Sequence, residues 1–179
     1  FSFSIYHNVQ TNGQRKKVGG ESNLLRQDIN ITGMSFGLGQ RLKWPDDYFT
    51  RYLEISGEQY QLNNFRSVFS FTDGTAYNIA ATFNLQRNSV DQPIYPRSGS
   101  QISLSTKLTL PYSFWRKDSL GGYPDYASME SAEKYKWIEY YKIKFSAAWY
   151  TKLVENLVLY NRIGFGFLGS YDKNLGTAP

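Results

Sequence analysis

Alternation of apolar and polar side chains recurs along this chain, and it limits the possible folds more than any other feature. Between residues 101 and 110, Ile102, Leu104 and Leu108 share one face of an extended strand, and Ser103 and Lys107 share the other. A period of two residues indicates a β-strand with one apolar face. Seven such strands are predicted, at residues 1–10, 25–42, 49–62, 77–86, 101–110, 140–150 and 157–168.

The lengths of these segments and of their connections favour a membrane barrel over a soluble sheet. Several segments reach about ten residues, whereas soluble strands average about five or six, and about ten tilted residues span a bilayer core. Short turns at 44–47, 95–99 and 151–156 alternate with longer loops. Outer-membrane barrels place short turns in the periplasm and long loops outside. We therefore predict an all-β fold, an antiparallel transmembrane β-barrel segment of about seven strands; a soluble β-domain is the alternative.

The composition agrees with strands that are apolar on one face only. Aromatic residues make up 17% of the chain, yet the mean hydropathy is −0.50. No apolar run approaches the roughly 18 residues of a transmembrane helix. Cysteine is absent, which excludes disulfides and thiolate metal sites. Aromatic residues near the short turns are predicted to form a periplasmic-side girdle: Trp44, Tyr48, Phe49, Tyr95, Trp149 and Tyr150.

Charge and residue chemistry argue against a nucleic-acid partner and against catalysis. The net charge of +5 is modest for a nucleic-acid binder, and the charges are spread along the chain. His7 is the only histidine, and no motif for a Ser-His-Asp triad accompanies it. No catalytic residue, cofactor-binding residue or metal ligand is therefore predicted.

Two groups of side chains are candidate functional sites. Four basic residues lie on the polar faces of predicted strands, which face the lumen in a barrel: Lys107, Lys142, Lys144 and Arg162. Charge of one sign needs partners, so acidic groups elsewhere in a longer chain, or water, are expected to satisfy it. The longest loop, 111–136, carries aromatic residues suited to protein contact: Trp115, Tyr123, Tyr126 and Tyr135. The alternative for this loop is a cap folded over the barrel mouth.

Two local features are also predicted. The apolar residues of segment 25–42 change face near Gly33, between Ile29 and Met34, which indicates a β-bulge at Gly33. Within the long loop, residues 129–136 are expected to form a short helix with Ser128 as its N-cap.

Residues 87–100 resemble the strand–turn–strand signature of the BamA-type bacterial surface-antigen family, with Arg-Asn at the start and Tyr-Pro-Arg-Ser-Gly before the next strand. Residues 37–49 resemble the corresponding earlier turn, and residues 165–171 resemble the strand before the family's long inward-folded loop. The resemblance implies strands five to eleven of a barrel of roughly sixteen. Residues 1–179 are thus expected to be part of one barrel domain within a longer chain. The periplasmic POTRA domains and the terminal barrel strands would lie outside it.

The resemblance also implies a non-enzymatic function. Members of this family act as the central barrel subunit of the outer-membrane protein assembly machinery, which folds and inserts β-barrel proteins without ATP. The expected partners are outer-membrane lipids, client β-barrel proteins, and accessory lipoproteins or other subunits of an assembly complex. The expected location is the outer membrane of a Gram-negative bacterium. Two alternatives stay open, a passive porin or nutrient receptor and, with less support, an outer-membrane barrel enzyme.

Overall fold

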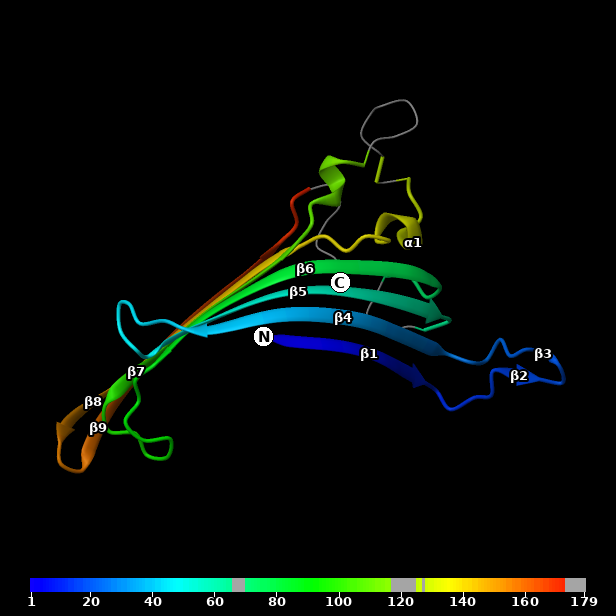
Figure 1. Ribbon diagram of the computed structural model, residues 1–179. Coiled ribbons are helices and arrows are strands. Elements are labelled where there is room, and N and C mark those ends of the chain that lie inside the picture. The colour runs from blue at the N-terminus through cyan, green and yellow to red at the C-terminus, as the bar shows by residue number, and fades with distance from the viewer. Residues whose placement is uncertain (66–69, 117–124, 127, 173–179) are drawn as a thin grey trace.

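The computed structural model describes residues 1–65, 70–116, 125–126 and 128–172 (Figure 1). Seven antiparallel strands form one sheet in the order β1-β4-β5-β6-β7-β8-β9. The strands are β1 (Ser2–Thr11), β4 (Asp28–Arg41), β5 (Phe49–Asn63), β6 (Gly74–Asn88), β7 (Gly99–Thr109), β8 (Tyr141–Val154) and β9 (Leu157–Gly169). The sheet is curved and open, with β1 and β9 at its edges, which confirms the predicted segment of a barrel wall. No helix among these residues is long and apolar enough to cross a membrane.

The connections differ between the two ends of the sheet (Figure 1). Turns join β4 to β5, β6 to β7 and β8 to β9 at one end, called here the turn end. The other end, called here the loop end, carries the connections at 12–27, 64–73 and 110–140, which include the two longest. The first of them, expected as a plain loop, contains a hairpin of β2 (Lys17–Val18) and β3 (Glu21–Ser22). The connection between β6 and β7 (89–98) is as long as the one between β5 and β6, so the predicted alternation of short and long connections does not hold at this pair.

Strand register assigns every side chain to one of two faces. Met34 pairs with both Ile5 and Gly57, and Phe36 pairs with both Phe3 and Ile55. The outer face is defined by the odd-numbered residues of β1, β5, β6, β8 and β9 and the even-numbered residues of β4 and β7. The remaining strand residues form the inner face.

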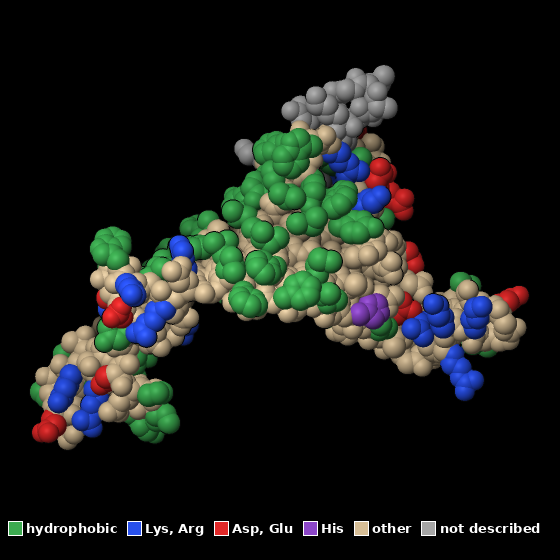
Figure 2. All heavy atoms as spheres, in the orientation of Figure 1, with side chains coloured by type: hydrophobic (Ala, Val, Ile, Leu, Met, Phe, Trp, Pro, Cys, Tyr) green, Lys and Arg blue, Asp and Glu red, His purple; other side chains and the backbone are tan. Residues whose placement is uncertain are grey.

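In Figure 2, hydrophobic side chains spread over the middle of the molecule and charged ones gather toward its ends.

The change of face near Gly33 is not a bulge, so that prediction is wrong. β4 pairs without interruption with both β1 and β5. Ile29 and Ile31 face inward because apolar groups from the loop end cover that part of the inner face. The buried members of this inner cluster are Ile29, Leu62, Phe71, Ala76 and Ile138. The strand register shifts instead in β8, between Lys152 and Val154.

The loop between β7 and β8 folds back over the loop end of the sheet. The backbone N–H of Tyr77 donates to the carbonyl of Lys136 at 2.7 Å, and that of Ile138 donates to the carbonyl of Tyr77 at 2.9 Å. Residues 136–138 therefore cover the edge of β6 beyond the end of β7, which leaves fewer unpaired backbone groups. Ile138 is buried in the inner cluster. These contacts favour the cap interpretation of the loop.

The predicted helix in this loop is present but shorter. Helix α1 (Ser131–Lys134) is a single turn whose N-cap is Glu130, without a side-chain capping bond. Ser128 is not the cap, because its hydroxyl donates to the carbonyl of Asp125 at 3.1 Å. The helix ends early because residues 136–138 are extended for pairing with β6. A 3₁₀ turn, η1 (Tyr112–Phe114), begins the same loop.

Candidate functional site

Large apolar side chains are exposed on the outer face. Ile5, Met34 and Ile55 each expose 60% or more of their surface. Monomeric soluble proteins rarely expose contiguous apolar patches of more than a few hundred Å². In a barrel the same surface contacts lipid acyl chains. The outer face is therefore a membrane-facing belt.

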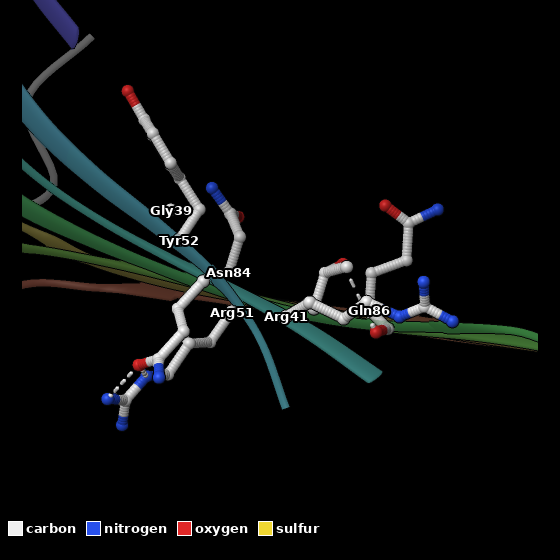
Figure 3. A pocket seen from close by; sticks show the side chains of 8 residues that line it. Gly39, Arg41, Arg51, Tyr52, Asn84 and Gln86 are labelled. Atoms are coloured by element: carbon white, nitrogen blue, oxygen red, sulfur yellow. Dashed lines mark hydrogen bonds between the residues drawn. The ribbon is translucent and has the colours of Figure 1, made fainter. Parts of the chain in front are cut away.

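Polar rows bound this belt on β4 and β5. At the loop end, the imidazole Nδ1 of His7 lies 2.8 Å from Oγ1 of Thr32, and Gln59 pairs with Thr32 in the ladder. At the turn end, Nη2 of Arg51 donates to Oε1 of Gln40 at 2.6 Å. Figure 3 shows Arg51 on the opposite side of the sheet from Tyr52. The uninterrupted apolar part of the outer face on β4 is thus only residues 34–38.

The belt is taller at the other side of the sheet. On β8 the outer face is apolar or aromatic along residues 141–149. Five residues rise about 16 Å along a strand and nine about 30 Å, and a tilt of about 45° reduces these heights to roughly 12 and 21 Å. The usual lipid-facing band of such barrels is about 25 Å tall. The belt of β4 and β5 is therefore about half the usual height.

The inner face carries acidic groups that sequence reasoning did not single out. The carboxylate of Glu58 accepts hydrogen bonds from the hydroxyls of Tyr6 and Tyr60 and from the amide of Asn78. Glu54 accepts one from the hydroxyl of Tyr52 at 2.9 Å. Both glutamates lie at polar positions of the alternating segment 49–62, and this pattern could have identified them as inner-face residues. These bonds pair two half-buried charges with neutral donors rather than with cations.

Two of these tyrosines lie over glycines of β4. A Cβ atom on Gly33 would lie 2.5 Å from Cζ of Tyr6, and one on Gly37 would lie 2.1 Å from the hydroxyl oxygen of Tyr52. Glycine permits this close approach because it has no side chain. The rings thereby reach Glu58 and Glu54, so the sequence of β4 shapes the network on β5.

All four predicted basic residues lie on the inner face, and three of them lie together. Lys107 pairs directly with Lys142 across β7 and β8, and Lys144 is two residues further along β8. Arg162 pairs with Ala148 and lies apart from the lysines. Directly opposed like charges are unfavourable. Part of the balancing charge lies within this chain, because Glu54 is separated from Lys107 only by Thr82 in the ladder.

The four aromatic loop residues have different environments. Trp115 is 67% exposed and available for contact. Tyr126 is buried, and this burial raises the pKa of its hydroxyl. Tyr135 packs against the inner cluster. Tyr123 lies outside the described residues.

A buried carboxylate holds the two arms of the cap together. Glu139 is 1% exposed. Its Oε2 accepts a hydrogen bond from the backbone N–H of Ser113 at 2.8 Å, and its Oε1 accepts one from the hydroxyl of Ser113 at 2.7 Å. The start of the loop is thereby fixed to the segment that leads into β8.

At the turn end, Arg87 joins two turns. Its Nε donates to Oδ2 of Asp46 at 2.9 Å, and its Nη1 donates to the hydroxyls of Ser89 and Ser100. Arg87 begins the family-like segment 87–100, whose structural role the sequence did not reveal. Nearby, the backbone N–H groups of residues 97 and 98 donate to Asp91.

The predicted periplasmic girdle needs one correction. Trp44, Tyr48 and Tyr95 are exposed at the turn end, and Trp149 lies on the outer face. Tyr150 lies on the inner face, where its ring stacks on that of Tyr160 with centroids 4.9 Å apart. Adjacent residues of a strand point to opposite faces, so Trp149 and Tyr150 cannot both face lipid.

Long antiparallel strands with a lipid-facing belt, a polar inner wall and short turns at one end define the wall of a transmembrane β-barrel. The family model described as the Omp85 superfamily domain matches residues 2–177, and the chain belongs to this superfamily. Its members are outer-membrane β-barrel proteins of Gram-negative bacteria that take part in protein insertion and assembly. Within the described residues, no group of three or more histidine, cysteine or acidic side chains could hold a metal ion.

Among solved structures, the chain is similar to "The crystal structure of BamA from Haemophilus ducreyi lacking POTRA domains 1-3". The TM-score is 0.60 at 17% sequence identity, a likeness that shows the fold. The match covers 98% of this chain and 30% of that chain, so this chain spans less than a third of that protein. No curated protein sequence matches the chain significantly.

Proposed function

We propose that this chain is part of the barrel wall of an outer-membrane assembly protein, which folds and inserts β-barrel proteins without ATP. The longer chain would carry periplasmic POTRA domains and the terminal barrel strands, and it would work with client barrels and accessory lipoproteins. Membership of the Omp85 superfamily supports the class of function. The uneven height of the outer-face belt supports a mechanism in which the barrel thins the lipid beside it.

A belt shorter than the bilayer thins the lipid around it. The uninterrupted apolar stretch of the outer face on β4 is residues 34–38, against 141–149 on β8. Lipid beside β4 and β5 would therefore be thinner than lipid beside β8 and β9. A thinner hydrocarbon layer lowers the cost of passing polar backbone groups through it. This mechanism uses no covalent chemistry and no nucleotide.

The direct test measures client insertion. Full-length protein in liposomes is mixed with an unfolded eight-stranded barrel, and folding is followed by the heat-dependent shift of the client on a gel. The client is expected to fold faster than in protein-free liposomes. A full-length protein that is itself folded but leaves the client's rate unchanged would contradict the proposal.

A passive pore is the second candidate, and one observation favours it. The inner face separates acidic groups on β5, Glu54 and Glu58, from the lysines of β7 and β8. Such a wall would give a channel an electric field across its lumen. Large, stable and ion-selective single-channel openings of the full-length protein would support this function. The enzyme alternative gains nothing from His7, which lies on the outer face beside Thr32.

A further inference from the structure

The rim of the loop end carries a groove that the proposed function does not use. It is formed by the beginning and the end of the loop between β7 and β8, and its volume is about 460 Å³. Its lining residues are Tyr112, Trp115, Arg116, Glu133, Lys136 and Trp137. All six are described residues, and none belongs to the inner-face network.

The aromatic side of this groove continues the lipid-facing surface of β6. The ring centroid of Trp137 lies 4.9 Å from that of Tyr77 and 4.7 Å from that of Tyr112. Tyr77 belongs to the outer face, two residues beyond Ile79 toward the loop end. The row of rings therefore lies where the apolar belt gives way to the loops. Aromatic side chains favour this level of a bilayer, the interface with the head groups.

Two cations face one carboxylate in the groove. Arg116 donates to the backbone carbonyl of Glu133 at 3.2 Å, and its Nη2 lies 3.4 Å from Oε1 of the same residue. Among the described residues, the Lys136 ammonium has no acidic side chain within ion-pair distance. The hydroxyl of Tyr112 is buried, and no described group bonds to it. Positive charge and a free hydroxyl thus lie beside flat apolar rings.

This combination matches the phosphate of a lipid head group. Arginine and lysine bind phosphate oxygens through charge-assisted hydrogen bonds. Cationic groups next to a membrane surface attract anionic head groups, and amphipathic rings rest well at the same level. A free soluble anion would not need the row of rings that links the groove to the outer face.

We propose that the groove binds the phosphorylated head group of an outer-leaflet lipid. Arg116 and Lys136 contact the phosphate, and Trp115 and Trp137 pack against the rest of the head group. The assignment rests on the proposed function only for the orientation of the barrel, with its long loops outside. It names a lipid contact on the rim and assigns no role in client insertion.

The test uses the full-length protein in detergent micelles, with diphosphorylated lipid A as the probe and native mass spectrometry as the measurement. In the double variant Arg116→Ala/Lys136→Ala, the affinity for lipid A is expected to fall at least about tenfold, because two cations at the membrane surface are removed. The matched control is Lys134→Ala. Lys134 lies on α1 with its ammonium 5.4 Å from the ring of Tyr135, does not line the groove, and is expected to leave binding unchanged.

Folding of each variant is checked by heat-dependent gel migration, and Lys136→Gln replaces the double variant if that variant misfolds. Equal lipid A binding by wild type and the folded groove variant would overturn the proposal, as would equal binding of dephosphorylated lipid A. Cross-links to protein alone from a photoreactive residue at position 115 in cells would also overturn it. Client insertion is assayed on the same samples. A wild type that binds lipid A through the groove but inserts no client would refute the proposed function and leave the lipid site standing.

Discussion

At the scale of single residues, the structure leaves no space for a methyl group added at Gly33. Its Cβ would lie 2.5 Å from the ring of Tyr6, which bonds to Glu58. Gly33→Ala is therefore expected to lower the free energy of unfolding by about 1–3 kcal/mol, through displacement of the ring and loss of its hydrogen bond. The measurement is urea unfolding of the full-length protein in micelles. Gly57→Ala is the control, because no atom lies within 4 Å of its added Cβ; an equal loss in both variants would contradict the argument.

Arg87 depends on the shape of its guanidinium group. One side chain serves Asp46, Ser89 and Ser100 through two different nitrogens. A lysine keeps the charge but loses the planar fork, so Arg87→Lys is expected to cost about 1–3 kcal/mol of unfolding free energy. Thermal unfolding of the full-length protein measures the effect. Arg97→Lys, at an exposed position of the neighbouring turn, should change the thermal stability little. Similar losses of stability in the two variants would show that the hydrogen bonds of Arg87 do not matter specifically for connecting the two turns.

Asp91 makes the turn between β6 and β7 sensitive to acid. Backbone N–H groups, first that of Ser98 and also that of Arg97, hold the pKa of its carboxyl below the ordinary value of 3.8. A lowered folded-state pKa contributes stability that is present above the ordinary pKa and is lost as pH falls through the lowered value. Asp91→Asn should therefore flatten the loss of thermal stability on acidification below about pH 4. Asp47→Asn serves as the control, and an unchanged slope in Asp91→Asn would count against this role.

At the scale of elements, the carboxylate of Glu139 holds the two arms of the β7–β8 loop together as a closed cap. Its carboxylate is the partner of both the N–H and the hydroxyl of Ser113. Glu139→Ala would leave two donors unpaired in a buried place, at a cost of about 1–3 kcal/mol each. Trypsin added outside proteoliposomes is expected to cut after Arg116 several-fold faster in this variant. Glu130→Ala, at an exposed position of the same loop, should be cut at the wild-type rate; protection of Arg116 in both variants would mean that another contact closes the cap.

For the charged residues of the inner face, the sequence of one strand predicts the direction of a side chain but not its neighbours on other strands. The alternation in segments 101–110 and 140–150 predicted the face of Lys107, Lys142 and Lys144, because side-chain direction in a strand is a local property. Their mutual distances are not local. The direct pairing of Lys107 with Lys142, and the position of Glu54 one strand beyond Thr82, follow from register across separate strands.

At the scale of the whole molecule, the uneven belt predicts a dependence on bilayer thickness. Thr32→Leu/Gln59→Leu would extend the belt of β4 and β5 by one row, roughly 5 Å of membrane height or slightly more. Since mismatch costs fractions of a kcal/mol per Å, client insertion in long-chain lipids is expected to slow by about fivefold. Ala81→Leu is the control, because it adds apolar surface within the belt without raising it. Equal rates for both variants across a series of lipid chain lengths would refute the thinning mechanism.

The strands, the faces of their side chains and the positions of the turns follow from the sequence alone. Each of these depends on the two-residue period of a strand and on the turn residues between strands, which act over short stretches of chain. The same local reasoning placed a bulge at Gly33 and a capping role on Ser128, and both predictions were wrong. Distant apolar groups cover Ile29 on the inner face, and the hydroxyl of Ser128 bonds to the carbonyl of Asp125 instead.

The contacts between those parts depend on the three-dimensional fold. Ile29 faces inward because Ile138, more than a hundred residues later, covers it, and the rim groove exists because Trp137 returns to Tyr77. Such contacts depend on register and on the path of a long loop, which the alternation of a single strand does not encode. The polar face of each strand could be read from the chain, whereas the partner of each polar group could not.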